Sequence, residues 1–147
     1  MKPKIYIDGK DGTTGLQIYD RLAARSDIDL LLIDEDKRKD PAERKKLMAA
    51  ADIVFLCLPD AAAVEAVALA EGTNARIIDA STAHRTAPGW VYRFPELKKG
   101  QREAIAKAKY VANPGCHATG FIAIAAPLVQ AGVLPADADL CCFSLTG

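Results

Sequence analysis

Cys116 is the residue of this chain whose surroundings best suit covalent chemistry. It follows Asn113-Pro114-Gly115, which come after a short apolar run, and an apolar helical pattern over 121–129 comes next. This order predicts a strand-to-helix turn with the thiol at or just before the first helical turn. Helix N-termini carry partial positive charge and unpaired N–H groups, which can lower the pKa of a thiol from about 8.5. Because the thiolate is the nucleophile, Cys116 is the candidate catalytic residue; the alternative is a small apolar side chain packed under the turn.

A glycine-rich segment near the N-terminus is the second candidate site, with the sequence Gly-Lys-Asp-Gly-Thr-Thr-Gly over residues 9–15. It lies between a strand pattern and a helix pattern, where glycines let backbone N–H groups cradle a pyrophosphate. The spacing is G-x-x-G-x-x-G rather than G-x-G-x-x-G, and no Lys-Ser/Thr pair follows, which excludes a P-loop. The alternative is a tight turn into a helix. We expect a dinucleotide cofactor bound by Gly9, Gly12, Thr13, Thr14 and Gly15.

The charges after the second predicted strand bear on which dinucleotide binds. Asp34 lies about 20 residues beyond the glycine segment, where a carboxylate bonds a ribose hydroxyl and favours NAD. Lys37, Arg38 and Lys39 follow at once and can bind a 2′-phosphate, which favours NADP. At least one of the three is expected to be a solvated loop residue. These residues alone leave both dinucleotides open, and Arg38 is the candidate contact to NADP.

The elements around these sites must position them, and strand patterns alternate with helix patterns along the chain. The expected strands are 4–8, 30–33, 53–58, 76–79, 110–112 and 140–145, and the expected helices are 16–24, one opening at residue 40, 61–70, 96–108 and one after residue 116. Residues 81–94 are expected to form a long loop. The alternation predicts a doubly wound, mostly parallel sheet, a Rossmann-like α/β fold. Ligands bind at the carboxyl ends of such strands, so the glycine segment, the His84-Arg85 loop and the cysteine turn are expected to converge there.

A few side chains are expected to set the helix ends. Asp40 can cap the helix that opens beside it, and Glu43 can reach back to it in a capping box. Asp60 can cap the alanine-rich helix that follows it. Pro127 is expected to kink the last helix or to start a new turn.

Composition places the chain among ordinary globular proteins. Its 147 residues are half hydrophobic, which is enough for one domain with a real core. Nineteen basic residues balance nineteen acidic ones, so we expect no nucleic-acid partner and no membrane surface, and no apolar run is long enough to span a bilayer. The four cysteines show no CxxC or Cys/His spacing, so no metal site is expected. With no signal-peptide pattern, a cytoplasmic, reducing location is the expectation.

Four segments carry a family resemblance when they are taken together. They are the 9–15 segment, Asp-Ala-Ser-Thr-Ala-His-Arg over 79–85, Ala-Pro-Gly-Trp over 87–90 and Asn-Pro-Gly-Cys over 113–116. This combination resembles N-acetyl-γ-glutamyl-phosphate reductase in its shorter variant, an arginine-biosynthesis family related to aspartate-semialdehyde dehydrogenase. The resemblance covers essentially the whole chain. It implies that Cys116 is the nucleophile, that the glycine segment holds NADP, and that Arg85 and Asn113 lie beside a small anionic substrate.

The reaction implied by the resemblance is reductive dephosphorylation of N-acetylglutamyl 5-phosphate to N-acetylglutamate 5-semialdehyde. The Cys116 thiolate would expel phosphate and form a thioester, which accepts hydride from NADPH far more readily than a carboxylate does. The N–H groups that begin the following helix are candidate donors to the oxyanion.

Two departures from the family pattern limit what the resemblance implies. His117-Ala118 stand where the family usually has Tyr-Pro. The family also continues past the equivalent of Gly147 into a dimerising substrate domain that supplies a catalytic histidine, which neither His84 nor His117 matches. We therefore expect a dinucleotide-binding domain over 1–135 and the first strand of a second domain over 136–147. Weak or absent turnover is expected of this chain alone, and a homo-oligomer of the full-length family.

Two alternative functions stay open at this point. One is the sister activity, aspartate-semialdehyde dehydrogenase, against which the 87–90 segment argues. The other is a dinucleotide-binding module without catalysis, in which Cys116 is inert. A substrate assay separates the first from the reductase, and the reactivity of the thiol with and without NADP separates the second.

Overall fold

Six strands form one sheet in the computed structural model, which describes residues 1–145. They are β1 (Lys4–Asp8), β2 (Asp29–Leu31), β3 (Ile53–Leu56), β4 (Arg76–Asp79), β5 (Val91–Tyr92) and β6 (Tyr110–Ala112). All neighbouring strands run parallel, in the order β2-β1-β3-β4-β6-β5. Strands that alternate with helices pair in this way, so the predicted doubly wound α/β fold is confirmed.

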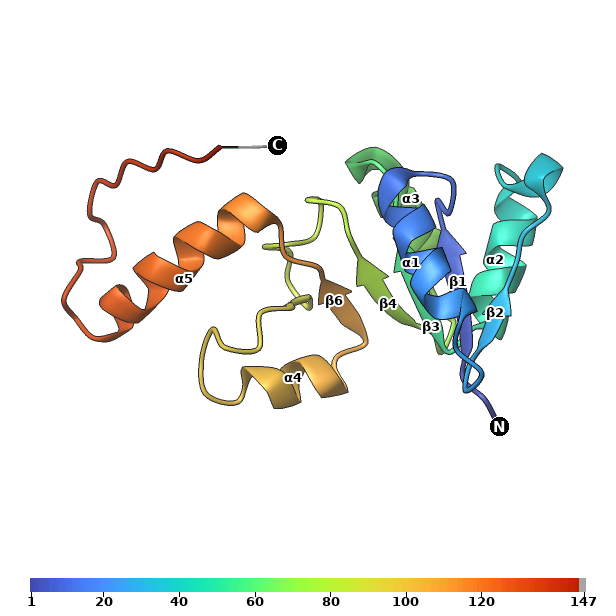
Figure 1. Ribbon diagram of the computed structural model, residues 1–147, viewed down its shortest axis with the longest axis horizontal. Coiled ribbons are helices and arrows are strands. Elements are labelled where there is room, and N and C mark those ends of the chain that lie inside the picture. The colour runs from blue at the N-terminus through green and yellow to red at the C-terminus, as the bar shows by residue number, and fades with distance from the viewer. Residues whose placement is uncertain (146–147) are drawn as a thin grey trace.

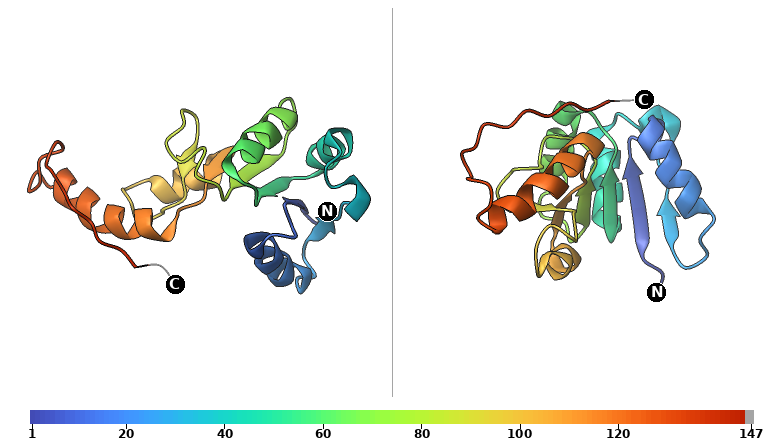
Figure 2. Two further views of the ribbon diagram at one scale, coloured as in Figure 1. Left: turned by 90° about the horizontal axis from the view of Figure 1, so that it is seen from above. Right: turned by 60° about the vertical axis from the view of Figure 1, so that its left-hand side comes forward.

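Helices connect the strands and cover both faces of the sheet. They are α1 (Thr13–Ala23), a 3₁₀ turn η1 (Glu35–Lys37), α2 (Pro41–Ala50), α3 (Asp60–Leu69), α4 (Gln101–Lys107) and α5 (Cys116–Gln130). Helix α1 lies on one face of the sheet, and α2 and α3 lie on the other (Figure 1, Figure 2). The chain therefore passes outward from β1 to β2 and returns on the opposite face to β3, so that the winding reverses between β1 and β3.

The core lies between the central strands and helices α2 and α3. Alternate residues of β3, Val54 and Leu56, are fully buried, as the period of two in a strand requires. Met48 of α2 and Ala66 of α3 pack in the same cluster, together with Ile77 of β4. Burying one large aliphatic side chain completely is worth about 1.5–3 kcal/mol, so these contacts fix the strands whose carboxyl ends carry the candidate sites.

Three strand predictions and one loop prediction differ from the structure. The strand predicted over 53–58 ends at Leu56. The second strand is only the short edge element β2, and Leu32 after it is 58% exposed, because an edge strand has a neighbour on one side alone. Within the predicted loop over 81–94, the short strand β5 pairs with β6. Residues 140–145 form no strand, because in the described part of the chain no strand lies beside them to share backbone hydrogen bonds. Residues 146 and 147, the end of the predicted second domain, lie outside the described residues.

The predicted cap of α2 is confirmed, but its capping box is not. The Asp40 carboxylate accepts a hydrogen bond from the Ala42 N–H at 2.9 Å. Glu43 instead pairs with Lys46 one turn along the helix, at 3.1 Å. This leaves Asp40 as the side chain that fixes the start of α2.

Two other helix predictions are wrong in position or partner. The polar helix α4 begins at Gln101 rather than at residue 96, because Gly100 before it adopts a left-handed φ of +83°. Asp60 makes no capping bond within α3. Its carboxylate binds the N–H and the hydroxyl of Thr82, in the loop after β4.

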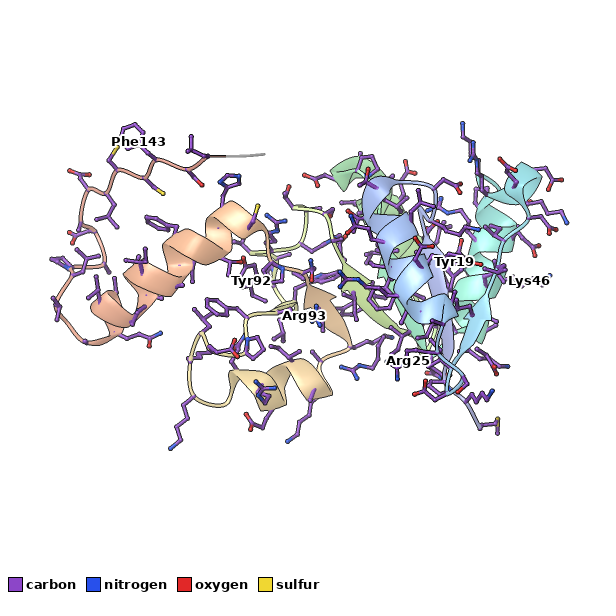
Figure 3. All side chains as sticks on the ribbon, in the orientation of Figure 1. Tyr19, Arg25, Lys46, Tyr92, Arg93 and Phe143 are labelled. Atoms are coloured by element: carbon purple, nitrogen blue, oxygen red, sulfur yellow. The ribbon has the colours of Figure 1, made fainter. Side chains whose placement is uncertain are left out.

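Helix α5 extends beyond the sheet and contains no buried residue. It continues through Pro127 to Gln130. One of the two predictions for Pro127, that it starts a new turn, is therefore wrong. The segment after α5 turns back along the helix (Figure 1). Phe143 in this segment is 93% exposed and points away from α5 (Figure 3).

Candidate active site

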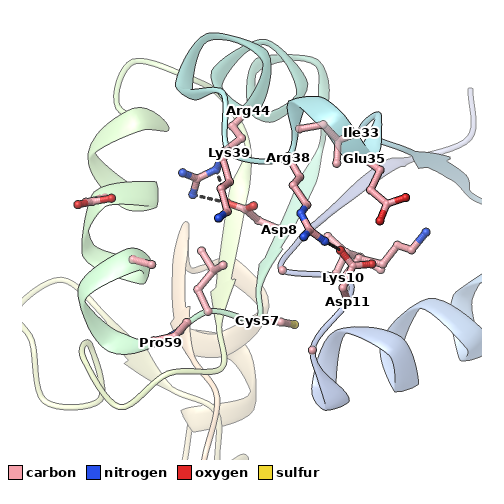
Figure 4. A pocket seen from close by; sticks show the side chains of 16 residues that line it. Asp8, Lys10, Asp11, Ile33, Glu35, Arg38, Lys39, Arg44, Cys57 and Pro59 are labelled. Atoms are coloured by element: carbon pink, nitrogen blue, oxygen red, sulfur yellow. Dashed lines mark hydrogen bonds and ion pairs between the residues drawn. The ribbon is translucent and has the colours of Figure 1, made fainter.

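A cleft of about 680 Å³ opens at the carboxyl ends of β1 and β3, where the winding of the sheet reverses. Ligands of doubly wound sheets bind at such a point, because the loops after the two strands leave in opposite directions. Figure 4 shows the side chains that line the cleft, and the charged ones include Asp8, Asp11, Arg38, Lys39 and Arg44. The predicted glycine segment contributes Gly9 and Gly12 to the lining.

Two glycines of this segment are required by close contacts. Gly9 follows β1 with a φ of +84°, and a Cβ atom there would lie 2.3 Å from the carbonyl oxygen of Cys57. At Gly15, in the first turn of α1, a Cβ atom would lie 2.2 Å from the carbonyl oxygen of Gly9. The loop therefore folds tightly enough for α1 to begin at the cleft. The exposed residues at this helix N-terminus are Gly12, Thr13 and Thr14, and its free N–H groups fit a pyrophosphate.

Of the three basic residues predicted to bear on the cofactor, two line the cleft. The Nη1 atom of Arg38 lies 2.9 Å from Oδ2 of Asp11, which places its guanidinium beside the glycine segment (Figure 4). Lys39 also lines the cleft. Lys37 instead binds Asp34 through a 3.0 Å ion pair, and neither of these two residues is part of the lining. From the sequence, either Asp34 or Arg38 could contact the ribose of the dinucleotide. In the structure Arg38 lines the cleft and Asp34 does not.

A buried ion pair fixes the strand end from which the glycine segment leaves. Arg44 of α2 donates to Oδ2 of Asp8 from Nη2 at 2.7 Å and from Nε at 3.2 Å. Their side chains are 12% and 5% exposed. The Tyr6 hydroxyl donates to the other oxygen of Asp8, and burial, followed by the charge of Asp8, raises the pKa of Tyr6 above its ordinary value. Sequence analysis did not find Arg44, because the two partners are 36 residues apart and nothing local links them.

Cys57 also lines the cleft, but its environment is unsuited to a nucleophile. The pKa of the Cys57 thiol is raised to about 11, mainly by burial. The negative charges of Asp79 and Asp8 raise it further. The thiol therefore stays protonated near neutral pH, and the protonated form is a poor nucleophile.

Cys116 is the first residue of α5 and is exposed, so the predicted strand-to-helix turn is confirmed. Gly115 precedes it as the N-cap residue, and the Gly115 carbonyl accepts from the Thr119 N–H at 2.9 Å and from its hydroxyl at 2.7 Å. The thiol is not in the cleft. Strand β6, which leads to it, is separated from β1 by β3 and β4, and three strand spacings amount to about 14 Å.

The loop after β4 brings Arg85 to the cysteine turn. A Cβ atom on Gly115 would lie 2.6 Å from Nη1 and 2.9 Å from Nη2 of Arg85, so the guanidinium packs directly on the backbone before Cys116. The Nε atom of Arg85 is buried and has no hydrogen-bond partner among residues 1–145. Of the three segments expected to converge, the His84-Arg85 loop and the cysteine turn therefore meet at the start of α5, with the Arg85 guanidinium on the backbone of Gly115.

Asp79 and His84 hold the first part of this loop. Asp79 ends β4 and is fully buried, and its Oδ2 atom lies 2.6 Å from both the Ser81 hydroxyl and Nδ1 of His84. The His84 ring stacks on Trp90 with 4.2 Å between the ring centroids. His84 is therefore a packing residue, while the exposed His117 contacts the Ser144 hydroxyl.

Asn113 lies between β6 and the cysteine turn, and its side chain is held by protein groups. Its Oδ1 atom accepts from Nη1 of Arg93 at 3.2 Å, and its amide donates to the Pro114 carbonyl at 3.3 Å. Figure 3 shows Arg93 beside this end of the sheet. Sequence analysis missed Arg93, which places a second guanidinium near Asn113, because the two are 20 residues apart and pair only through β5 and β6.

Residues 1–145 hold neither a cluster of metal ligands nor a helix suited to a membrane. No three His, Cys, Asp or Glu side chains gather there in a way that would hold a metal ion. None of the helices in this part of the chain combines the length and the apolar character that crossing a bilayer requires.

A family model described as the NAD binding domain of semialdehyde dehydrogenase matches residues 31–108, which are more than half of the chain. The chain belongs to this semialdehyde dehydrogenase family. The match supports a nicotinamide dinucleotide as the cofactor of this domain. The match includes Arg38 and Arg85 but neither the glycine segment nor Cys116, so the roles of single site residues remain predictions.

Curated relatives are similar to the chain over nearly all of its length. An N-acetyl-gamma-glutamyl-phosphate reductase from Trichormus variabilis is 56% identical over 146 residues, which are 99% of this chain and 45% of that protein. One from Brucella ovis is 59% identical over 138 residues, which are 93% of this chain and 44% of that protein. The resemblance predicted from the sequence motifs is confirmed, and the chain spans about half the length of the curated relatives it matches.

Solved structures share the fold at low sequence identity. Aspartate semialdehyde dehydrogenase II from Vibrio cholerae, complexed with ASA, gives a TM-score of 0.64 at 14% identity over 89% of this chain and 47% of that one. The aspartate semialdehyde dehydrogenase from Francisella tularensis gives 0.62 at 17% identity, over 90% and 42% of the two chains. These likenesses support the architecture and carry no information on the substrate.

Proposed function

We propose that this chain carries the dinucleotide cleft and the nucleophile of an NADPH-dependent N-acetyl-γ-glutamyl-phosphate reductase. The curated relatives at 56–59% identity bear that name. The structural observation that carries the proposal is Cys116 at the first position of α5, with Arg85 packed on the residue before it. A thiol next to a guanidinium and to free helix N–H groups suits attack on an anionic acyl phosphate.

In this proposal the Cys116 thiolate attacks the γ-carbonyl carbon of the acyl phosphate. A C–S bond forms and the C–O bond to phosphate breaks, which leaves an acyl thioester on Cys116 and releases inorganic phosphate. NADPH, when bound, supplies the hydride that reduces the thioester carbonyl. Cys116 then departs as the thiolate, the C–S bond breaks, and the aldehyde is released.

The groups around Cys116 have distinct tasks in this reaction. The N–H groups of the first turn of α5 stabilise the oxyanion that forms when the carbonyl is attacked. Arg85 offsets the negative charge of the acyl phosphate and of the departing phosphate. We assign Asn113 to the substrate side as well, where the Arg93 contact holds its amide in one orientation.

NADP is the proposed form of the dinucleotide. Arg38 and Lys39 line the cleft beside the glycine segment, whereas Asp34 is paired with Lys37 away from it. Arg38→Ala should weaken NADP binding at least tenfold and leave NAD binding nearly unchanged, because only NADP has a 2′-phosphate. Lys37→Ala is the matched control, since it removes a neighbouring cation outside the cleft. Titration of both nucleotides by calorimetry measures these effects, and NAD binding as tight as NADP would contradict the assignment.

A reverse-direction assay tests the reaction itself. N-acetylglutamate 5-semialdehyde, phosphate and NADP are the substrates, and NADPH absorbance is the readout. We expect Cys116→Ser to abolish turnover and Cys141→Ser to retain it. Turnover with aspartate semialdehyde in place of the N-acetylated substrate would favour the sister activity, and turnover that survives Cys116→Ser would contradict the proposal.

We further propose a cytoplasmic homo-oligomer in which more of the protein than residues 1–135 completes the substrate site. Support comes from the relatives, which are about twice as long, and from exposed apolar side chains on α5 such as Ile124, 70% exposed. Turnover by this chain alone should then be weak, since a general acid–base group is typically worth about 10²–10⁴ in rate. Light scattering gives the oligomeric state. A monomer with full Cys116-dependent turnover would contradict this part of the proposal.

A further inference from the structure

The loop that delivers Arg85 to the cysteine turn is held by two carboxylates on different elements. On the side of the sheet, the buried Asp79 binds Ser81 and His84. On the other side lies Asp60, the first residue of α3, whose carboxylate accepts from the Thr82 N–H at 2.9 Å and from the Thr82 hydroxyl. Removing the Asp60 contact therefore leaves the Asp79 contacts in place.

Asp60 uses both carboxylate oxygens on a loop that is 22 residues away instead of on its own helix. The hydrogen bonds from Thr82 are the main cause that lowers the pKa of Asp60, and the charge of Arg85 adds to it. Pro59, directly before Asp60, lines the dinucleotide cleft. Asp60 thus links the edge of the cleft to the loop that leads to the thiol.

The position of Arg85 depends on the course of this loop. Its Nε atom has no hydrogen-bond partner among the described residues, and its terminal nitrogens pack on the Gly115 backbone. Because no hydrogen bond within residues 1–145 fixes the Nε atom, the position of the Arg85 guanidinium depends largely on the position of the Arg85 backbone. Thr82 and Asp60 are both exposed, so without their contact Thr82 and Ala83 are free to shift, and His84, bound to Asp79, is the one anchor left beside Arg85 in this part of the loop.

We propose that Asp60 is a positioning residue for the nucleophile: by binding Thr82 it keeps Arg85 on Gly115, next to Cys116. The inference rests on the proposed function only in taking Cys116 as the nucleophile. The Asp60 carboxylate on α3 makes no hydrogen bond to the thiol or to Arg85, and it acts on the position of the Arg85 guanidinium through Thr82.

Charge-selective alkylation of Cys116 in the full chain tests this inference. Iodoacetate is an anion and iodoacetamide is its neutral counterpart, so the ratio of their rate constants reports a nearby cation while the intrinsic reactivity of the thiol cancels. Peptide mass spectrometry assigns the rates, and Cys142 is the internal reference. We expect a ratio about fivefold higher at Cys116 than at Cys142, falling toward the Cys142 value in Asp60→Ala and in Arg85→Ala, in which only the partial charge of the α5 N-terminus remains beside the thiol.

Matched variants separate positioning from a general loss of structure or charge. Thr82→Ser keeps both bonds to Asp60 and should retain the wild-type ratio, whereas Thr82→Val loses the hydroxyl bond and should lower it. Glu71→Gln removes one carboxylate at the far end of α3 and should change nothing. Circular dichroism checks that each variant is folded, and Thr82→Val replaces Asp60→Ala in the comparison if the latter unfolds.

The results that overturn the inference are distinct from those that overturn the proposed function. Equal ratios at Cys116 and Cys142 in the wild-type protein overturn the inference, because no cation then acts on the thiol. A wild-type ratio in folded Asp60→Ala or Thr82→Val, while Arg85→Ala lowers it, also overturns it. Turnover that survives Cys116→Ser defeats the proposed function instead, and the alkylation ratios still decide the role of Asp60.

Discussion

At the scale of single residues, the two cysteines on the strand ends have opposite environments. Cys57 is partly buried and keeps its proton, with a pKa of about 11, whereas Cys116 is exposed and follows Gly115, on which Arg85 packs. We predict that iodoacetamide near neutral pH modifies Cys116 readily and leaves Cys57 unmodified until the protein unfolds. Mass spectrometry of partly alkylated protein gives the order. Equal modification of the two thiols would remove the distinction on which the assignment of the nucleophile rests.

The raised pKa of Cys57 also predicts how stability depends on pH. The folded state holds the proton more tightly than the unfolded state does, so the stabilisation is complete below the ordinary pKa of a thiol and is lost as the pH rises through the folded-state pKa of about 11. The free energy of unfolding should fall over this range, and less steeply in Cys57→Ala. Urea unfolding at a series of pH values measures both slopes. Identical slopes would contradict the burial of the thiol, since Tyr6 titrates in both proteins and cancels in the comparison.

The buried pair of Asp8 and Arg44 gives a prediction of stability. Arg44→Met should cost about 3–5 kcal/mol, because it leaves the Asp8 carboxylate buried without its partner. Lys46→Met on the same helix breaks only the surface pair with Glu43 and should cost less than about 1 kcal/mol. Urea unfolding measures both variants. Similar losses in the two would mean that Asp8 is hydrated in the folded protein.

At the scale of elements, different glycines of the glycine segment are required by the fold and by the proposed cofactor. A Cβ atom at Gly15 would meet the backbone of Gly9 at 2.2 Å, whereas one at Gly12 would come no closer than 3.5 Å to that backbone. We therefore predict that Gly15→Ala destabilises the protein by about 1–3 kcal/mol, as forced overpacking does. Gly12→Ala should keep the stability of the wild type but weaken NADP binding, because the cofactor approaches that backbone.

Thermal unfolding and nucleotide titration of the two variants test this division. Gly12→Ala with unchanged NADP affinity would show that the pyrophosphate is bound elsewhere. Gly15→Ala with wild-type stability would show that α1 can shift away from the loop without cost.

The elements that the sequence could predict are those set by local pattern. The alternating apolar runs and turns predict β1, β4 and β6 with their observed bounds, and the turn before Cys116 follows from its neighbours. Elements that depend on a distant partner could not be predicted from local pattern. β5 exists only because β6 lies beside it, and the strand predicted over 140–145 does not form because no strand among residues 1–145 lies beside it. The same holds for side chains, since the partners of Arg44 and Asp60 lie 36 and 22 residues away.

At the scale of the whole molecule, the cleft and the thiol stand at opposite ends of a row of four strands. The glycine segment follows β1 and Cys116 follows β6, with β3 and β4 between them. Three strand spacings of about 4.8 Å separate the two sites by about 14 Å along the carboxyl edge of the sheet. A bound dinucleotide has to lie along this edge for its nicotinamide to meet a thioester on Cys116.

This arrangement predicts that the two halves of the cofactor act on different sites. NADP should slow the alkylation of Cys116, because its nicotinamide reaches the thiol, whereas 2′-phospho-ADP-ribose should bind the glycine segment and Arg38 and leave the rate unchanged. Alkylation rates at saturating concentrations of each ligand measure the difference, and Arg38→Ala should raise the NADP concentration that protection requires. Equal protection by both ligands would mean that binding reshapes the cysteine turn from a distance. Binding of NADP without any protection would place its nicotinamide away from Cys116 and would separate the cleft from the proposed reaction.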